Sequence, residues 1–239
     1  MAEFSELWKG GPVFAQAAHF RLSTDSVLLS DFIRVSGMRR GIDLGCASGI
    51  ISLLLLARTQ RLHMTGLEIV PEAAELAVEN MERNSLSDRS DIICGDIRRC
   101  RELFAPGSFD LVAANPPYYS TASGAVSPSG ERARARSELD CSLDDVCSAA
   151  AYLCRTGGYF SLVGKPERLT ETMLLMSSHG IEPKRMRLVC SLPEKAPSLF
   201  LLEGKRGASP GLVIEPNLCL NLSDGTESPE YKRIYHREQ

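Results

Sequence analysis

The segment Asn115-Pro116-Pro117-Tyr118 holds the residues of this chain that are best suited to chemistry. The apolar run at 109–114 directly before it has the length of a buried strand, and prolines end a strand because they cannot donate a ladder hydrogen bond. A carboxamide, two rigid rings and a phenol therefore follow the carboxyl end of a strand, where ligands bind in open α/β sheets. A turn that only terminates the strand is the alternative.

A glycine-rich turn forms the second candidate site. Asp43, Gly45, Cys46 and Gly49 lie between a short apolar strand and an apolar helix. Glycine permits tight turns and close approach of a ligand to the backbone, as in dinucleotide-binding folds. Glu68 ends the next expected strand, at the spacing typical of a carboxylate that accepts hydrogen bonds from ribose hydroxyls. Together, these residues favour nucleoside binding over a plain turn and a solvated surface charge.

Two further segments carry polar side chains toward the same region. Asp96 ends a third short strand in Gly-Asp, where it could accept a hydrogen bond from an adenine amino group or simply form a turn. The loop at 120–140 holds Arg132, Arg134 and Arg136 at alternate positions. These arginines could line a phosphate-contacting edge, and a solvated charged loop is the equal alternative.

The composition limits the class of protein. Of the 239 residues, 44% are apolar and 24% charged, as in ordinary globular proteins, and the net charge of −3 argues against indiscriminate nucleic-acid binding. Any nucleic-acid contact must therefore come from a local basic face. The longest apolar run, at 50–57, is too short to span a bilayer, and the N-terminus does not resemble a signal peptide. We expect a cytoplasmic monomer without membrane contact.

The cysteine and histidine pattern gives no metal site. None of the eight cysteines forms a C-x-x-C pair, and no two histidines stand at ligand spacing. We expect no bound metal and reduced cytosolic thiols, with Cys46 and Cys94 as packing residues.

The elements that must position these residues alternate between strands and helices. Expected strands lie near 41–44, 62–68, 91–96, 109–114, 159–163, 186–192 and 198–203. Expected helices begin at Ser23-Thr24-Asp25, after Gly49, at Pro71, after Ser142 and at Pro166. The order predicts an α/β fold with a mostly parallel seven-stranded sheet, helices on both faces and a C-terminal antiparallel hairpin.

The glycine turn identifies a class of enzyme. An NAD dehydrogenase should show G-x-G-x-x-G, but the pattern starting at Gly45 gives Ala47 and then Ile50. The run D-L-G-x-x-x-G instead resembles the turn of Rossmann-like class I methyltransferases that use S-adenosylmethionine, and the similarity covers roughly residues 40–165. Many members carry glycine at the position of Ala47. The resemblance implies that the turn lies against the methionine and ribose of the cofactor, with Glu68 on the ribose and Asp96 near the adenine.

The Asn-Pro-Pro-Tyr motif resembles that of enzymes which methylate an exocyclic or amide nitrogen. An adenine amino nitrogen is a poor nucleophile because its lone pair is delocalised into the ring. The Asn115 side-chain oxygen and the Pro116 carbonyl would accept both amino hydrogens and free the lone pair, and the prolines would hold both acceptors rigidly. Tyr118 would stack on an unpaired or flipped-out base. Direct in-line displacement needs no covalent intermediate, and the Pro-Cys pair of cytosine-C5 enzymes does not occur in the chain.

A closer resemblance covers nearly the whole chain. It rests on Phe-Arg-Leu-Ser-Thr-Asp-Ser-Val-Leu-Leu at 20–29, Asn-Pro-Pro-Tyr-Tyr at 115–119, Ala-Arg-Ser-Glu at 135–138 and Gly-Ile-Glu-Pro-Lys-Arg at 180–185. These segments resemble the bacterial tRNA adenine-N6 methyltransferases that modify the adenosine next to the anticodon of a valine tRNA. The family implies N6-methyladenosine formation in tRNA, with S-adenosyl-L-methionine as methyl donor.

The resemblance also implies the site residues and the division of the chain. The catalytic residues would be Asn115, Pro116, Pro117 and Tyr118. The cofactor would contact Ser23, Thr24, Asp25, Asp43, Gly45, Cys46, Gly49, Glu68, Ile69, Asp96, Ile97 and Asn115. The RNA side would include Tyr119, Arg132, Arg134, Arg136 and Glu138. We expect one domain with an N-terminal segment at 1–38 packed on the cofactor site, a catalytic core at 39–205 and a partly mobile C-terminal extension at 206–239.

Three alternatives use similar residues. A protein-glutamine N5 methyltransferase acting on release factors applies the same motif to an amide nitrogen, but that family usually has a helical domain before its core, and here only about 40 residues precede the first strand. Ribosomal RNA guanine-N2 methylation is a second alternative, in which phenylalanine more often replaces the tyrosine. A non-catalytic cofactor-binding partner is the third, and it predicts loss of the acceptor that Asn115 supplies here.

Overall fold

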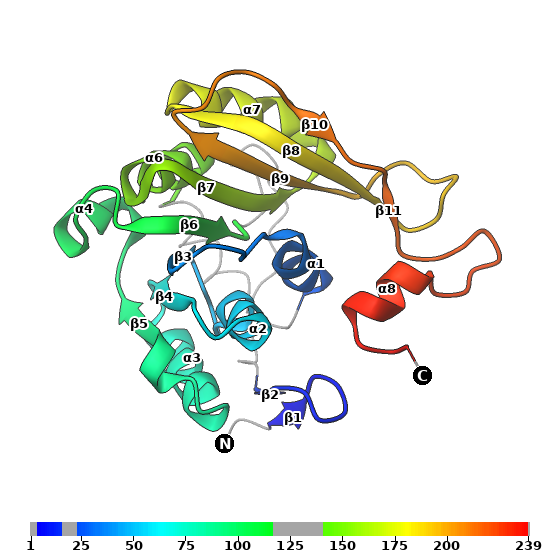
Figure 1. Ribbon diagram of the computed structural model, residues 1–239, viewed down its shortest axis with the longest axis horizontal. Coiled ribbons are helices and arrows are strands. Elements are labelled where there is room, and N and C mark those ends of the chain that lie inside the picture. Colours follow the sequence, from blue (N-terminus) through cyan, green and yellow to red (C-terminus); the bar gives the residue numbers. More distant parts are fainter. Residues whose placement is uncertain (1–3, 16–22, 117–140, 239) are drawn as a thin grey trace, which may run out of the picture.

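A central β-sheet organises the protein. The computed structural model describes residues 4–15, 23–116 and 141–238, and within these ranges the sheet has nine strands in the order β10-β8-β9-β7-β6-β3-β4-β5, with β11 beside β8 (Figure 1). The longer strands are β3 (Arg40–Leu44), β4 (His63–Glu68), β5 (Ser90–Cys94), β6 (Phe109–Ala114), β7 (Cys154–Gly164), β8 (Ile181–Cys190) and β9 (Leu199–Arg206). The two-residue strands β10 (Val213–Ile214) and β11 (Leu218–Cys219) pair parallel to β8.

The pairing confirms the expected fold class. Strands β3 to β7 are parallel, whereas β9 runs antiparallel to both β7 and β8. Both late strands are longer than predicted: β8 begins at Ile181, and its ladder shifts register between Pro183 and Arg185. A proline in a sequence run suggests a strand end, but a bulge accommodates it within the strand.

Helices cover both faces of the sheet. Helices α1 (Thr24–Phe32), α2 (Ile50–Arg58) and α3 (Pro71–Arg83) contribute to one hydrophobic cluster, and α4 (Cys100–Leu103), α6 (Leu143–Leu153) and α7 (Leu169–Ser178) to the other (Figure 1). Short 3-10 turns lie at Ser87–Arg89, Ile97–Arg99 and Pro166–Arg168. Alternate residues of one strand face opposite clusters: Leu111 and Ala113 of β6 pack in the first, and Val112 and Ala114 in the second. In the described ranges no helix is both long and apolar enough to cross a membrane.

Both ends of the chain pack on the α1 side of the sheet. At the N-terminus, β1 (Ser5–Glu6) and β2 (Val13–Phe14) form a small antiparallel hairpin. The polar C-terminal extension forms helix α8 (Pro229–Ile234), whose Ile234 is buried in the same cluster as α1. The Trp8 indole stacks on the His236 ring with 4.0 Å between centroids, so the two ends meet. The sequence did not predict this docking.

Candidate cofactor and acceptor site

The carboxyl ends of three adjacent strands bring the candidate residues together. Strand β3 lies between β4 and β6, so the glycine turn that follows β3 has Glu68 on one side and Asn115 on the other (Figure 1). This is the sheet edge at which the sequence placed the site.

The glycine turn has the backbone that its sequence predicts. Gly45 and Gly49 have φ angles of +73° and +83°, and the Gly45 N–H donates to the Leu67 carbonyl at 2.8 Å. A Cβ at Gly49 would lie 3.0 Å from Met81 Cε, so glycine lets α3 pack against the turn. Among the described residues, a Cβ at Gly45 would have only Ile97 Cδ1 within reach, at 4.0 Å. These residues thus leave space beside Gly45, and a ligand can approach the backbone there.

The backbone conformation of Ala47 explains why many related turns carry glycine at this position. Its φ angle is +47°, in the left-handed region where a side chain costs about 1 kcal/mol. Glu68 compensates for this strain, because its Oε2 accepts the Ala47 N–H at 2.8 Å while its Oε1 accepts the Val70 N–H at 2.9 Å. Glu68 is only 5% exposed. Its carboxylate therefore braces the turn, and ribose binding by the same group stays a prediction.

Asp43 is a buried acid directly before the turn. Its side chain is fully buried, and neither carboxylate oxygen has a hydrogen-bond partner among the described residues. Burial, together with the nearby Glu68 charge, raises the pKa of Asp43 to about 8, and the Ser52 backbone amide opposes this rise only in part. The hydroxyls of Ser48 and Ser52 are also buried without partners in the described chain.

These unpaired groups fit a cationic cofactor. A buried carboxylate without a partner is costly, and a nearby positive charge offsets that cost. S-adenosylmethionine carries an ammonium and a sulfonium, so its binding beside Gly45 would place positive charge close to Asp43. In the parts of the chain that the structure describes, no three His, Cys, Asp or Glu side chains gather to hold a metal ion.

The two cysteines expected to be packing residues, Cys46 and Cys94, differ in their exposure to solvent. Cys46 is buried against β4, where a Cβ added to Gly66 would lie 2.7 Å from its Sγ, and burial raises the pKa of the Cys46 thiol well above its ordinary value. Only the Cys46 backbone can therefore face a ligand. Cys94 is exposed, so its assignment as a packing residue is wrong. It ends β5, the outermost strand on that side of the sheet.

Asp96 forms the turn that was its alternative role. Its carboxylate accepts the Arg98 N–H at 2.9 Å and pairs with the Arg98 guanidinium, and hydrogen bonding from the Arg98 side chain holds the pKa of Asp96 below its usual range. Adenine recognition by this carboxylate stays a prediction. Ile97 points toward Gly45, and Ile69 exposes 43% of its surface after β4. Both are placed to offer apolar surface to a ligand at this edge.

Asn115 contacts the start of helix α1. Its Nδ2 donates to Ser26 Oγ at 2.8 Å and to Ser23 Oγ at 3.4 Å. Ser23 is also the N-cap of α1, since its Oγ accepts the Ser26 N–H at 3.3 Å. Ser26 was missing from the expected site residues. Its signal was its place in the first turn of a capped helix, three residues after Ser23, but nothing in the sequence paired it with a residue 89 positions away.

Some of the remaining predicted site residues lie within the described ranges and others lie outside them. Thr24 begins helix α1 on the side near Tyr235 of the C-terminal extension, and Asp25 lies in the first turn of the same helix. Pro116 is partly buried directly after Asn115. The other expected residues on the acceptor side lie outside the described ranges: Pro117, Tyr118, Tyr119, Arg132, Arg134, Arg136 and Glu138.

Comparison with known proteins identifies the family of the chain. Residues 8–128 match the model of the family described as methyltransferase small domain. A tRNA1(Val) (adenine(37)-N6)-methyltransferase from Porphyromonas gingivalis is 30% identical over 90% of this chain and 86% of its own length. A protein of the same name from Yersinia pseudotuberculosis is 31% identical over 94% of this chain and 90% of its own.

A solved structure shows the same fold. A predicted O-methyltransferase from Agrobacterium tumefaciens superposes with a TM-score of 0.72 at 20% identity, over 90% of this chain and 96% of its own. The Rossmann-like methyltransferase fold is thus shared beyond close relatives. The chain belongs to the methyltransferase small domain family and, within it, to the tRNA1(Val) (adenine(37)-N6)-methyltransferases.

Proposed function

We propose that this protein transfers a methyl group from S-adenosylmethionine to the N6 amino group of an adenosine in tRNA. The relatives' name specifies adenine 37 of a valine tRNA, and we extend that substrate to this chain. One observation supports the proposal above all others. The Asn115 carboxamide follows β6 at the sheet edge that holds the glycine turn, and its amino group is turned toward Ser26.

The turn side would hold the methyl donor. We assign the space beside Gly45 to the cofactor, with the Glu68 carboxylate toward the ribose and Ile69 and Ile97 as apolar neighbours of the adenine. The buried Asp43 would ionise when the positively charged cofactor binds nearby, and its carboxylate would then contribute negative potential. When bound, S-adenosylmethionine supplies an electrophilic methyl group on its sulfonium, so the chain has only to position and activate the amine.

The acceptor side would activate the amine. With Nδ2 of Asn115 directed at Ser26, Oδ1 is the atom of the amide that we assign to one amino hydrogen of the substrate. The Pro116 carbonyl would accept the second. Acceptors that are oriented before substrate arrives would meet the condition for electrostatic stabilisation of the transition state. Tyr118 and the arginines at 132, 134 and 136 are proposed to stack on the base and to contact RNA phosphates.

Variants of Asn115 test the proposal. Purified Asn115→Ala should lose at least about a hundredfold in labelled-methyl transfer to tRNA while its affinity for S-adenosylmethionine changes less than about threefold. Asn217→Ala is the matched control, because Asn217 is an exposed asparagine outside the site. Near-normal turnover of Asn115→Ala would refute the acceptor role. Label in release factors but not in tRNA would support the glutamine-methylating alternative.

We also propose that the enzyme works in the cytoplasm, as a monomer, on free tRNA. Size-exclusion chromatography with light scattering should give one species near 26.1 kDa, and a dimer would contradict this. Nucleoside mass spectrometry of tRNA from cells without the protein should show loss of one N6-methyladenosine.

A further inference from the structure

Among the described residues, the first turn of helix α1 contacts the proposed acceptor Asn115 through a short hydrogen bond. Ser26 is 6% exposed, and its Oγ lies 2.8 Å from Asn115 Nδ2 and 3.2 Å from Ser23 Oγ. A carboxamide is nearly symmetric in shape, so a half-turn would exchange its oxygen with its amino group. If the amino group of Asn115 faced the substrate amine, donor would meet donor and no hydrogen bond could form. A serine hydroxyl can donate or accept, but when Ser26 gives its hydrogen to Ser23 Oγ, the Ser26 oxygen is left as an acceptor and favours the amino end of Asn115. The contact with Ser26 then bears on which end of Asn115 meets the substrate.

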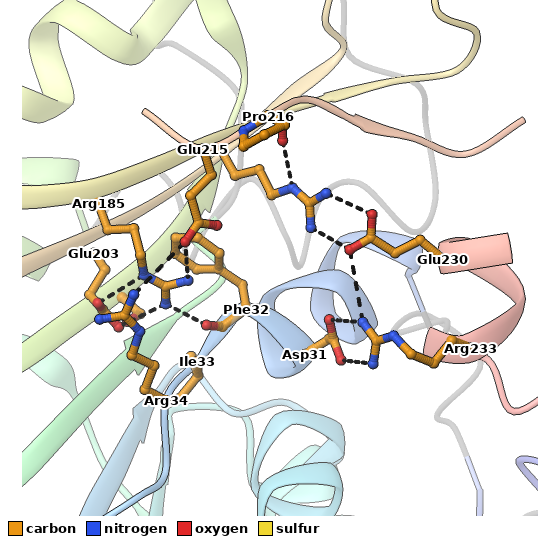
Figure 2. Close-up of polar contacts among 12 residues, drawn as sticks. Asp31, Phe32, Ile33, Arg34, Arg185, Glu203, Glu215, Pro216, Glu230 and Arg233 are labelled. Atoms are coloured by element: carbon orange, nitrogen blue, oxygen red, sulfur yellow. Dashed lines mark hydrogen bonds and ion pairs between the residues drawn. The ribbon is translucent and has the colours of Figure 1, made fainter. Parts of the chain in front are cut away.

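Two arginines hold the carboxyl end of α1. Arg185 of β8 donates from Nη2 to the Phe32 carbonyl at 2.5 Å, and its guanidinium carbon lies 3.7 Å from the centroid of the Phe32 ring (Figure 2). Arg58 of α2 donates to the carbonyls of Ser30 and Ile33. Positive charge at a helix carboxyl end is favourable because it pairs with the unsatisfied carbonyls there.

Arg185 is itself held by buried carboxylates. Its side chain is 8% exposed and that of Glu203 only 2%, with Arg185 Nε at 3.1 Å from Glu203 Oε1. Glu215 of the C-terminal extension approaches the same guanidinium at 3.3 Å and Arg34 at 3.8 Å (Figure 2). Loss of one partner of a buried ion pair leaves an uncompensated charge, so this cluster is rigidly specified.

The C-terminal extension holds the flank of α1. Arg233 of α8 makes two hydrogen bonds to the Asp31 carboxylate, at 3.0 and 2.9 Å, and Glu230 accepts two from Arg187 of β8, both at 2.7 Å (Figure 2). Helix α8 also packs directly against α1. The extension thus bridges β8 and α1.

We propose that α1 is the positioning element of the acceptor amide: Ser26 sets the orientation of the Asn115 carboxamide, and the C-terminal extension holds α1 where this contact requires it. This inference rests on the proposed function, because the orientation of the amide affects catalysis only if Asn115 accepts the amino hydrogens of the substrate. Ser26 and Arg233 are positioning residues, because both act through other groups. The expected signature is a change in kcat with little change in cofactor affinity.

Ser26→Ala tests the first half, with Ser30→Ala as its control. Ser30 is a buried serine one turn along the same helix, and its hydroxyl donates to the Ser26 carbonyl at 2.7 Å instead of touching Asn115. Ser26→Ala should lower kcat about tenfold, while Ser30→Ala changes it less than about twofold. The affinity for S-adenosylmethionine should be unchanged in both. Equal effects of the two variants, or no effect of Ser26→Ala, would overturn the assignment.

The side-chain amide of Asn115 gives a readout that does not depend on catalysis. Its 15N resonance, assigned by its loss in Asn115→Ala, should shift and exchange its protons faster in Ser26→Ala but not in Ser30→Ala. If the wild type does not methylate tRNA and this coupling is present, the proposed function fails and the positioning stands. If tRNA is methylated and the Asn115 resonance is the same in wild type and Ser26→Ala, the positioning role of Ser26 is refuted and the proposed function stands.

Charge reversal tests the second half. Asp31→Arg and Arg233→Asp should each lower kcat about threefold to tenfold, and the double variant, which restores an opposite pair, should recover at least half of the lost rate. Asp31 and Arg233 lie outside the proposed cofactor and substrate contacts, so the KM for S-adenosylmethionine should not move. A fall in melting temperature without any change in kcat at 25 °C would show that the extension only stabilises the fold.

Discussion

Replacing Asp43 with asparagine tests the electrostatic account of the glycine turn. The folded-state pKa of about 8 stands against an ordinary value of 3.8. Between these values the folded chain retains a proton that the unfolded chain releases, so stability is fully present below about pH 4 and is lost as pH rises toward about 8. One pKa unit corresponds to about 1.4 kcal/mol, so at pH 7 the buried acid costs the cofactor-free protein about 4 kcal/mol.

The assay is urea unfolding between pH 5 and pH 9 without cofactor. The free energy of unfolding of the wild type should fall by about 1.4 kcal/mol per pH unit between pH 5 and about pH 7 and level off beyond pH 8. Asn does not titrate, so Asp43→Asn should lack this fall, and the comparison of slopes is independent of any fixed cost of the new amide.

Asp110→Asn is the matched control. Burial works to raise the pKa of Asp110, on the adjacent strand β6, but hydrogen bonds from the Arg155 side chain and from the Arg39 and Arg40 backbone outweigh it and lower the pKa. The wild-type Asp110 therefore contributes stability above its unfolded pKa that is lost on acidification, the opposite sign to Asp43. Parallel pH profiles for wild type and Asp43→Asn would refute a strongly raised pKa at Asp43. The account also requires S-adenosylmethionine to flatten the wild-type slope, because bound positive charge favours the ionised acid.

Three further substitutions address the turn. Glu68→Gln keeps one acceptor but sets an amino group against the Ala47 or the Val70 N–H, so S-adenosylmethionine, measured by calorimetry, should bind about tenfold more weakly; unchanged affinity would remove Glu68 from the site. Ala47→Gly should raise the free energy of unfolding by up to about 1 kcal/mol, because it relieves a left-handed alanine, and a loss of stability in the urea titration would contradict that. Gly49→Ala should destabilise by about 1–3 kcal/mol through contact with Met81 and its positive φ, with a wild-type urea midpoint as the refuting result.

Local sequence patterns predicted what depends on local chemistry. The alternation of strands and helices, the glycine turn and the capped start of α6 at Ser142 follow from periodicity and from residues that cap or turn the chain, and all are found. The strand ends were less predictable: Gly157 and Gly158 suggest a turn before a strand, but they lie inside β7 where its pairing with β6 shifts register. Tertiary pairing overrode the local signal there.

Contacts between distant segments were beyond prediction from one sequence. The polar composition of the C-terminal extension indicates mobility, since polar tails bury little apolar area. Its docking depends on specific partners instead: the bidentate pairing of Arg233 with Asp31 joins residues 202 positions apart. Arg185 lies in a segment that carried the family resemblance, yet only the fold shows that it caps α1. Such pairings are properties of geometry, because each residue alone is an ordinary surface charge.

The glycine turn contains two groups that cost stability, whereas Asn115 follows the neighbouring strand in a well-paired setting. Asp43 is buried without a partner among the described residues, and Ala47 has a left-handed backbone. Both cost stability in the free protein, and the first is offset when a cation binds. On the side that we propose for the acceptor, Asn115 contacts a helix whose own ends are capped and paired. The difference follows from the two tasks. A charged cofactor can compensate a charged site when it arrives, whereas a neutral amine brings no such energy and must find its acceptors already in place.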